Sequence, residues 1–197
     1  METIYLVHHG EALDDVEDRY GGWSDDPLTE KGKQTARELA QRLNTLSPKP
    51  KKIYSSPFKR AHETAKIISS VLEIPGKKVD ELKERNRYGV LTSLTKTEAI
   101  KKYPKLVEKV KDYMQTIDEA ETYKHYKDRV LKGLNKILNK LDEDILIVCH
   151  GGTFRIVMWE LLGRKDYEKA NLHAILKIEK EGNKLELKTF EGLKLKS

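Results

Sequence analysis

Two histidines of this chain, His9 and His150, each follow a short apolar run and each precede a glycine. The apolar runs, at residues 4–7 and 145–149, have the length and composition of buried β-strands. Glycine lets the backbone turn sharply and approach a ligand closely, so the two imidazoles can converge beyond the ends of these strands. Imidazoles placed in this way can serve as nucleophiles or as partners of an anion.

One arginine is expected beside them. Arg60 falls in the first turn of a helix predicted after Ser55, Ser56 and Pro57, which resemble a strand end, an N-cap and a proline at the first helical position. An arginine at such a place is by itself most often a surface cation. Beside two converging histidines, its planar guanidinium is suited to phosphate oxygens.

The segments that position these side chains alternate between strand and helix patterns. Apolar residues at helical spacing indicate helices ending near residues 43, 72, 117, 141 and 162. Thr29 is a predicted N-cap, Thr95 and Glu98 form a predicted capping box, and Pro104 should break or kink the third helix. Strands are expected at residues 4–7, 53–54 and 145–149, and two more at 172–178 and 185–190 flank a turn.

This alternation predicts a three-layer α/β sandwich, with a mainly parallel sheet, helices on both faces and a C-terminal hairpin at the edge. No internal repeat or linker divides the chain, so we expect a single domain over residues 1–197. Ligands of such sheets bind beyond the carboxyl ends of the strands, which is where His9 and His150 stand.

Composition narrows the classes of partner. The net charge is +6, but acidic residues are interleaved with the basic ones, which indicates a solvated surface rather than a nucleic-acid site. No apolar stretch approaches the roughly 20 residues of a membrane helix. The one cysteine, Cys149, sits within a predicted strand and is interpreted as a packing residue. A single cysteine and no leader pattern favour a cytoplasmic protein.

Five ordered segments resemble the histidine phosphatase superfamily, which includes the cofactor-dependent phosphoglycerate mutases and many small phosphatases. They are LVHHGE at 6–11, DPLTEKG at 26–32, YSSPFKRA at 54–61, LKER at 82–85 and VCHGG at 148–152. The resemblance implies that His9 attacks phosphorus and becomes phosphohistidine. It implies that Glu84 protonates the leaving alcohol, and that Arg60 and His150 hold the phosphoryl oxygens. It implies no cofactor and no metal.

Further phosphate-binding positions follow from the same resemblance. Gly21 and Gly22 lie in a mutase-like segment, and Gly151 follows the second histidine. Two positions depart from the family pattern. His8 stands where the family has an arginine that contacts the phosphoryl group, and Asp15 stands where mutase-like relatives have an asparagine. A protonated His8 could pair with Asp15 and partly replace the arginine.

The favoured function is a phosphatase that acts on a small phosphate monoester. Residues 84–92 look mutase-like, although Asn86-Arg87 adds a residue, and the long mutase insertion with paired arginines is not seen after Tyr103. A phosphoglycerate mutase and a catalytically weak binding protein of the same fold remain alternatives. The oligomeric state is left open by the sequence.

Other chemistries find less support. A metal hydrolase is disfavoured because His8 and His9 should point to opposite sides of an extended strand and lack a spaced ligand set. No phosphate loop of a nucleotide-binding enzyme is present. The remaining histidines, His62, His125 and His173, are not predicted to belong to a site.

Overall fold

A six-stranded sheet forms the centre of the computed structural model, which describes residues 1–196. Its strands lie in the order β3-β2-β4-β1-β5-β6. Their bounds are β1 (Glu2–His8), β2 (Lys52–Ser55), β3 (Gly76–Lys78), β4 (Ile145–Cys149), β5 (Tyr167–Glu181) and β6 (Lys184–Leu195). Strands β3, β2, β4 and β1 pair in parallel, whereas β5 and β6 form an antiparallel hairpin at the edge. The predicted fold class is therefore confirmed.

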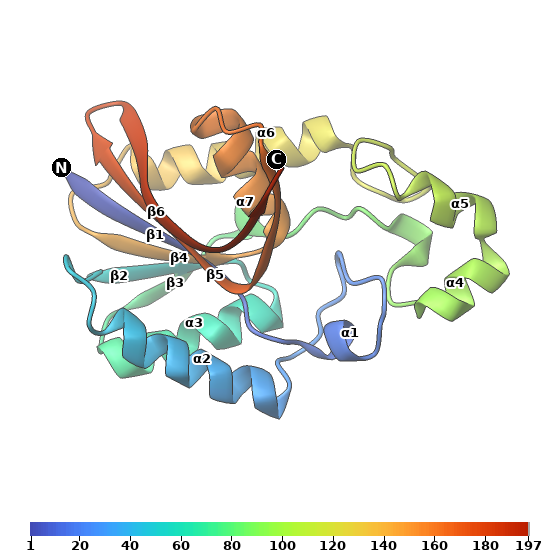
Figure 1. Cartoon of the computed structure of the whole chain (residues 1–197), viewed down its shortest axis with the longest axis horizontal. Coiled ribbons are helices and arrows are strands. Elements are labelled where there is room, and N and C mark those ends of the chain that lie inside the picture. The colour runs from blue at the N-terminus through green and yellow to red at the C-terminus, as the bar shows by residue number, and fades with distance from the viewer. Residues whose placement is uncertain (197) are drawn as a thin grey trace.

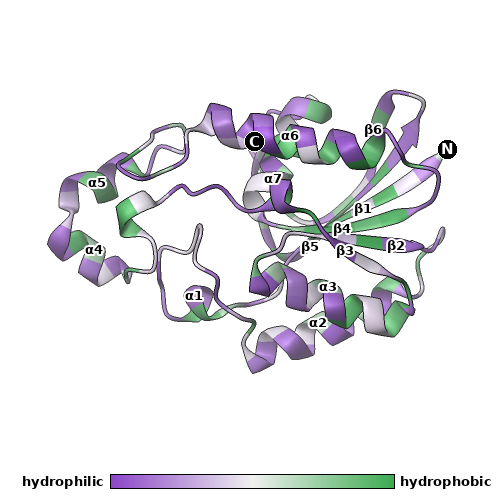
Figure 2. Ribbon diagram, turned by 180° about the vertical axis from the view of Figure 1, so that it is seen from behind, coloured by the Kyte–Doolittle hydropathy of each residue, from purple (hydrophilic) through white to green (hydrophobic). Residues whose placement is uncertain are grey.

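Helices cover both faces of the sheet (Figure 1). Helices α2 (Glu30–Leu43) and α3 (Lys59–Leu72) pack on one face, and α6 (Tyr123–Leu138) and α7 (Gly151–Ile156) on the other. The alternation of β1 shows why: Ile4 and Leu6 pack on the α6 side, and Tyr5 and Val7 on the α2 side. Figure 2 shows the hydrophobic residues concentrated along the central strands. Strand β4 is buried along its whole length, as its sequence predicts.

A smaller lobe extends beyond the carboxyl ends of the central strands (Figure 1). It contains α1 (Leu13–Val16), α4 (Lys96–Lys102), α5 (Pro104–Lys109) and the 3₁₀ turn Gly89–Leu91. The lobe has its own hydrophobic cluster, made of Tyr20, Leu91, Ala99, Val107, Val110 and Ile117. The lobe supplies residues that face the carboxyl ends of the central strands.

Local signals for helix ends were mostly correct. Thr29 Oγ1 accepts a hydrogen bond of 2.8 Å from the Gly32 amide, and Thr95 and Glu98 form the capping box. Pro104 separates α4 from α5 and occupies the first turn of α5. The helix predicted to continue to residue 117 was wrong, since α5 ends at Lys109 and Met114 is exposed.

The predicted start of α3 was also wrong. The helix begins at Lys59 with Phe58 as its N-cap, so Pro57 precedes it. Ser56 does not cap the helix in the predicted way, because its hydroxyl pairs with His150. None of the helices within residues 1–196 combines the length and apolar character that crossing a membrane requires.

Candidate active site

A cavity of about 300 Å³ is lined both by residues at the carboxyl ends of the central strands and by residues of the lobe. Its walls are formed by His8, His9, Asp14, Asp15, Arg19, Gly21, Gly22, Arg60, Glu84, Arg85, Arg87, Tyr88, Tyr113, Gly152 and Leu172. Most of the residues predicted from the sequence therefore share one cavity. His150 is fully buried behind it, with its ring centre 5.1 Å from that of His9.

His9 is held in one tautomer. Its Nδ1 lies 2.8 Å from the Gly10 carbonyl oxygen, which can only accept, so Nδ1 carries the proton. Nε2 is left with its lone pair, 3.3 Å from Nε of Arg60. Burial, together with the neighbouring His8 and Arg60, holds the pKa of His9 well below its ordinary value. The imidazole is thus neutral and nucleophilic at neutral pH.

His8 and His9 lie on the same side, which corrects the expectation of opposite directions. Their ring centres are 4.5 Å apart and both side chains line the cavity. The alternation rule does not apply because β1 ends at His8, and the chain turns into Gly10.

Arg60 is fixed by the loop that carries the two predicted glycines. Its terminal nitrogens donate to the carbonyl oxygens of Ser24 at 2.6 Å and Gly22 at 2.9 Å. Gly22 has a φ of +58°, a conformation that favours glycine. The guanidinium is buried, and its Nε faces His9. A planar cation therefore stands beside the candidate nucleophile.

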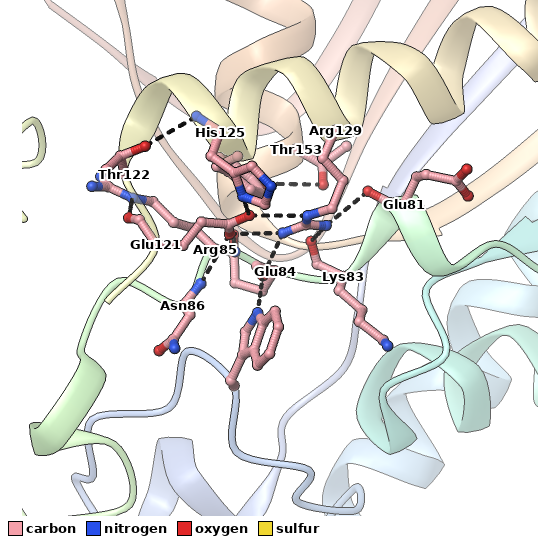
Figure 3. A network of polar contacts seen from close by, with 12 residues as sticks. Glu81, Lys83, Glu84, Arg85, Asn86, Glu121, Thr122, His125, Arg129 and Thr153 are labelled. Carbon is pink, nitrogen blue, oxygen red and sulfur yellow. Dashed lines mark hydrogen bonds and ion pairs between the residues drawn. The ribbon is translucent and has the colours of Figure 1, made fainter. Parts of the chain in front are cut away.

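Glu84 is anchored at both its side chain and its main chain. Its carboxylate accepts from the amides of Gly152 at 3.0 Å and Arg85 at 2.7 Å. Its carbonyl oxygen accepts from Trp23 Nε1 at 2.7 Å and from Arg129 at 3.3 Å (Figure 3). A contact from α7 to its carboxylate and a contact from α6 to its main chain therefore hold Glu84 in the cavity.

Arg129 organises the segment around Glu84 (Figure 3). It donates to the carbonyl oxygens of Glu81 at 2.9 Å and Lys83 at 3.0 Å, and it pairs with the Glu121 carboxylate at 2.8 Å. Glu121 in turn contacts Nδ1 of the exposed His125 at 2.7 Å. The prediction that His125 lies outside the site agrees with this exposed position.

His8 and Asp15 do not form the pair that the sequence suggested. His8 Nδ1 lies 2.8 Å from the Asn171 carbonyl oxygen, while the Asp15 carboxylate accepts from the Ala12 amide at 2.9 Å. Burial lowers the pKa of His8, so it is a weak substitute for the family's arginine at neutral pH. Burial raises the pKa of Asp15.

His150, which follows β4, pairs with Ser56, which follows the neighbouring strand β2. Its Nε2 lies 2.8 Å from the Ser56 hydroxyl, and its Nδ1 has no hydrogen-bond partner within residues 1–196. Burial and the nearby Arg60 hold its pKa well below the ordinary value. This histidine is therefore a neutral donor or acceptor at neutral pH.

Gly21 and Gly22 line the cavity as predicted, whereas Gly151 does not and Gly152 takes its place. The sequence did not single out Asp14, Arg19, Arg85, Arg87, Tyr88, Tyr113, Gly152 or Leu172 as site residues. Two arginines, Arg85 and Arg87, follow Glu84 closely in sequence, and this was a usable signal for Arg87. Tyr113 carried none, because it lies in the irregular segment between α5 and α6. Leu172 carried none, because it lies in the stretch of β5 where the pairing with β6 is irregular.

His62, His173 and Cys149 lie outside the cavity lining. His62 Nδ1 is 3.4 Å from the Ser55 hydroxyl. His173 occupies a bulge of β5 with a φ of +57°, and burial lowers its pKa to about 4. Cys149 is buried in the core, and burial raises its pKa well above the ordinary value, so its thiolate is disfavoured. Within residues 1–196, no three His, Cys, Asp or Glu side chains form a group able to hold a metal ion.

The family model of the histidine phosphatase superfamily, branch 1, matches residues 4–191. The chain belongs to this superfamily. It is 32% identical to the "Uncharacterized phosphatase PhoE" of Bacillus subtilis, over 83% of this chain and 79% of that protein. It is 29% identical to the 2,3-bisphosphoglycerate-dependent phosphoglycerate mutase 2 of Gloeobacter violaceus, over 87% of this chain and 82% of that protein.

Solved structures agree with the superfamily fold. The structure of Bacillus stearothermophilus YhfR covers 95% of each chain with a TM-score of 0.83 and 28% identity. The alpha-ribazole phosphatase of Shigella flexneri has the same TM-score at 21% identity, covering 99% of this chain and 96% of that one, and shows the fold alone. Members of the superfamily are thus phosphatases and mutases, and the predicted resemblance is confirmed.

Proposed function

We propose that this histidine phosphatase superfamily member hydrolyses a small phosphate monoester through a phosphohistidine on His9, without a metal. The observation that carries the proposal is the fixed tautomer of His9. Its Nδ1–H is bound to the Gly10 carbonyl, and its unprotonated Nε2 accepts a hydrogen bond of 3.3 Å from Arg60 Nε in the cavity.

The first step transfers the phosphoryl group to the enzyme. The bond between His9 Nε2 and phosphorus forms as the bond from phosphorus to the ester oxygen breaks. Protonated Glu84 gives its proton to the departing oxygen, which would otherwise leave as an unstable alkoxide. Arg60 and His150 would stabilise the charge on the phosphoryl oxygens.

The second step releases phosphate. Glu84, now a carboxylate, takes a proton from water as the water oxygen attacks phosphorus and the bond to His9 breaks. Both steps need Glu84 within reach of the oxygen that enters or leaves. The two amide contacts from Gly152 and Arg85 support this role because they fix the carboxyl group in the cavity.

The test compares the wild-type protein with His9→Ala on a panel of phosphate monoesters in the presence of a chelator. We expect phosphate release that resists chelation in the wild type and is lost in the variant. Alkali-stable, acid-labile labelling of the wild type by a ³²P ester should report phosphohistidine. Arg37→Ala, on the exposed face of α2, is the matched control. Turnover that persists in His9→Ala, or that disappears with chelator, would contradict the proposal.

The same assay separates the alternatives. Interconversion of phosphoglycerates primed by bisphosphoglycerate, without net phosphate release, would indicate a mutase. Binding of the esters with neither reaction would indicate a phospho-ligand-binding protein.

The single cysteine, which is buried and free, supports the expectation of a cytoplasmic enzyme.

A further inference from the structure

The cavity holds polar groups that the proposed phosphoryl transfer does not use. Arg87 and Tyr113 both line it. Nε of Arg87 and the phenolic oxygen of Tyr113 are buried and have no hydrogen-bond partner among residues 1–196. A buried donor without an acceptor is unfavourable, so these two groups are suited to a ligand that supplies acceptors.

The guanidinium of Arg87 is held in place while its Nε stays free. One terminal nitrogen donates to the Val110 carbonyl oxygen. Its central carbon lies 4.8 Å from the ring centre of Tyr113 and 5.5 Å from that of Tyr88. These contacts fix the side chain before any ligand binds, which lowers the entropy lost on binding.

Positive charge gathers around the ring of Tyr113. Besides Arg87, the guanidinium carbons of Arg155 and Arg85 lie 4.2 Å and 5.3 Å from its centre. None of these three arginines forms an ion pair with a carboxylate in the described part of the chain. Arg85 is buried, and Arg87 and Arg155 are half-buried. Cations shielded from water in this way normally have a counter-ion, so a bound anion fits the cluster.

The carboxylates of the cavity do not fill that role. Glu84 accepts from two amides and Asp15 from the Ala12 amide. Asp14 approaches the Ser24 hydroxyl at 3.5 Å. The phenol of Tyr113 remains a donor at every working pH, because burial raises its pKa.

We propose that Arg87 and Tyr113 form a subsite for a second anion, a carboxylate or a phosphate, on the alcohol part of the substrate. This inference rests on the proposed function, in which Glu84 protonates the leaving alcohol. Glu84, Arg87 and Tyr113 line the same cavity, so the alcohol is released into the space that the subsite faces.

Three matched esters test the subsite. They are 3-hydroxypropyl phosphate, 3-(phosphonooxy)propanoate and propane-1,3-diyl bisphosphate, which carry a hydroxyl, a carboxylate or a second phosphate on the same three-carbon chain. For the wild type we expect kcat/KM to be at least tenfold higher for one of the two esters that carry a second anionic group than for the hydroxyl ester, as a charge-assisted hydrogen bond predicts. The better of the two identifies carboxylate or phosphate as the recognised group.

Variants tie the preference to the two residues. Arg87→Gln and Tyr113→Phe should lower kcat/KM for the preferred ester about tenfold more than for the hydroxyl ester, mainly through KM. Arg87→Lys should retain part of the preference, because it keeps the charge but not the planar fork. Arg37→Gln, on the exposed face of α2, is the matched control and should keep the wild-type ratio. Melting temperatures of all variants identify any that are unfolded.

Equilibrium binding keeps the two proposals distinguishable. Calorimetric titration of the three esters into His9→Ala measures the preference without turnover. Equal affinities for all three, or an equal loss in Arg87→Gln for every ester, would overturn the subsite whatever the turnover. Failure of the wild type to hydrolyse any ester while it still binds the anionic ones more tightly would overturn the proposed reaction and leave the anion subsite standing.

Discussion

The Gly152 amide donates a hydrogen bond of 3.0 Å to the Glu84 carboxylate, although the two residues are 68 positions apart in sequence. Gly152 lies in the first turn of α7, directly after His150 and Gly151. A methyl group on Gly152 would lie 2.2 Å from the Glu84 carboxylate and 2.6 Å from the Tyr126 hydroxyl. The turn that follows the second histidine therefore also sets the position of the proposed proton donor, which makes it a sensitive place for substitution.

Gly152→Ala should displace Glu84 and impair proton donation. We expect kcat for an alkyl phosphate to fall by roughly 100-fold, the usual contribution of a general acid. The loss should be much smaller for p-nitrophenyl phosphate, whose leaving group needs little protonation. Gly151→Ala is the matched control, because its added methyl group would meet only the His8 ring at 3.8 Å. Equal losses on both substrates would show that Gly152→Ala acts by general disruption.

Arg129→Met should affect both stability and catalysis. It removes three donors from the segment around Glu84 and leaves the Glu121 carboxylate, which is 7% exposed, without its guanidinium. We expect a loss of about 3 kcal/mol in the free energy of unfolding and a fall in kcat with little change in KM. Urea unfolding and steady-state kinetics measure the two effects.

A double variant separates the two roles of Arg129. Arg129→Met with Glu121→Gln removes the orphaned charge and should recover part of the stability. Activity should stay low, since the carbonyl oxygens of Lys83 and Glu84 still lack the hydrogen bonds that Arg129 supplied. Full recovery of activity with stability would show that Arg129 does not position Glu84.

His8→Arg should strengthen the phosphate site. His8 is buried and its pKa is lowered, so it is mostly uncharged at pH 7, whereas arginine stays charged. We expect kcat/KM at pH 7 to rise by roughly tenfold, with the advantage shrinking as acid protonates His8 in the wild type. Asn135→Arg, at an exposed position of α6, controls for added charge. A fall in kcat/KM in a folded His8→Arg protein would refute this expectation.

The buried histidines predict loss of stability in acid. The pKa values of His9 and His150 are held well below the ordinary value in the folded protein, and that of His173 is lowered to about 4. An unfolded histidine titrates near 6.5, so below that pH the unfolded chain binds more protons and the folded state loses stability. For His173 the loss should extend from about pH 6.5 to about pH 4.

Asp14 and Asp15 act in the opposite direction, since burial raises their pKa values and acid then favours the folded state. A comparison of variants isolates the histidine contribution. His173→Asn keeps a residue type tolerated at a φ of +57° and removes the titrating ring. Its melting temperature should fall less than that of the wild type between pH 6.5 and pH 4.5. If the melting temperature of His173→Asn falls with pH as steeply as that of the wild type and of the exposed-site control His125→Asn, a role for His173 is contradicted.

The sequence alone predicted the superfamily, the layers and a set of candidate site residues, most of which the structure brings into one cavity. Uninterrupted apolar runs define β1 and β4 as buried strands, and the residues directly after them lie at the same end of the sheet because the strands are parallel. Thr29, Thr95 and Pro104 mark helix ends because capping and proline geometry depend only on neighbouring residues. Such signals are local, so they can be read before folding.

Only the tertiary structure decided how those residues act. The tautomer of His9 depends on the direction of the Gly10 carbonyl, and the Ser56 hydroxyl is paired with His150, which lies 94 positions further along the chain. Tyr113 reaches the cavity through an irregular loop whose carbonyl oxygens are held by Arg85. These outcomes depend on contacts between residues far apart in the chain, and no local pattern records which distant donor will meet which acceptor.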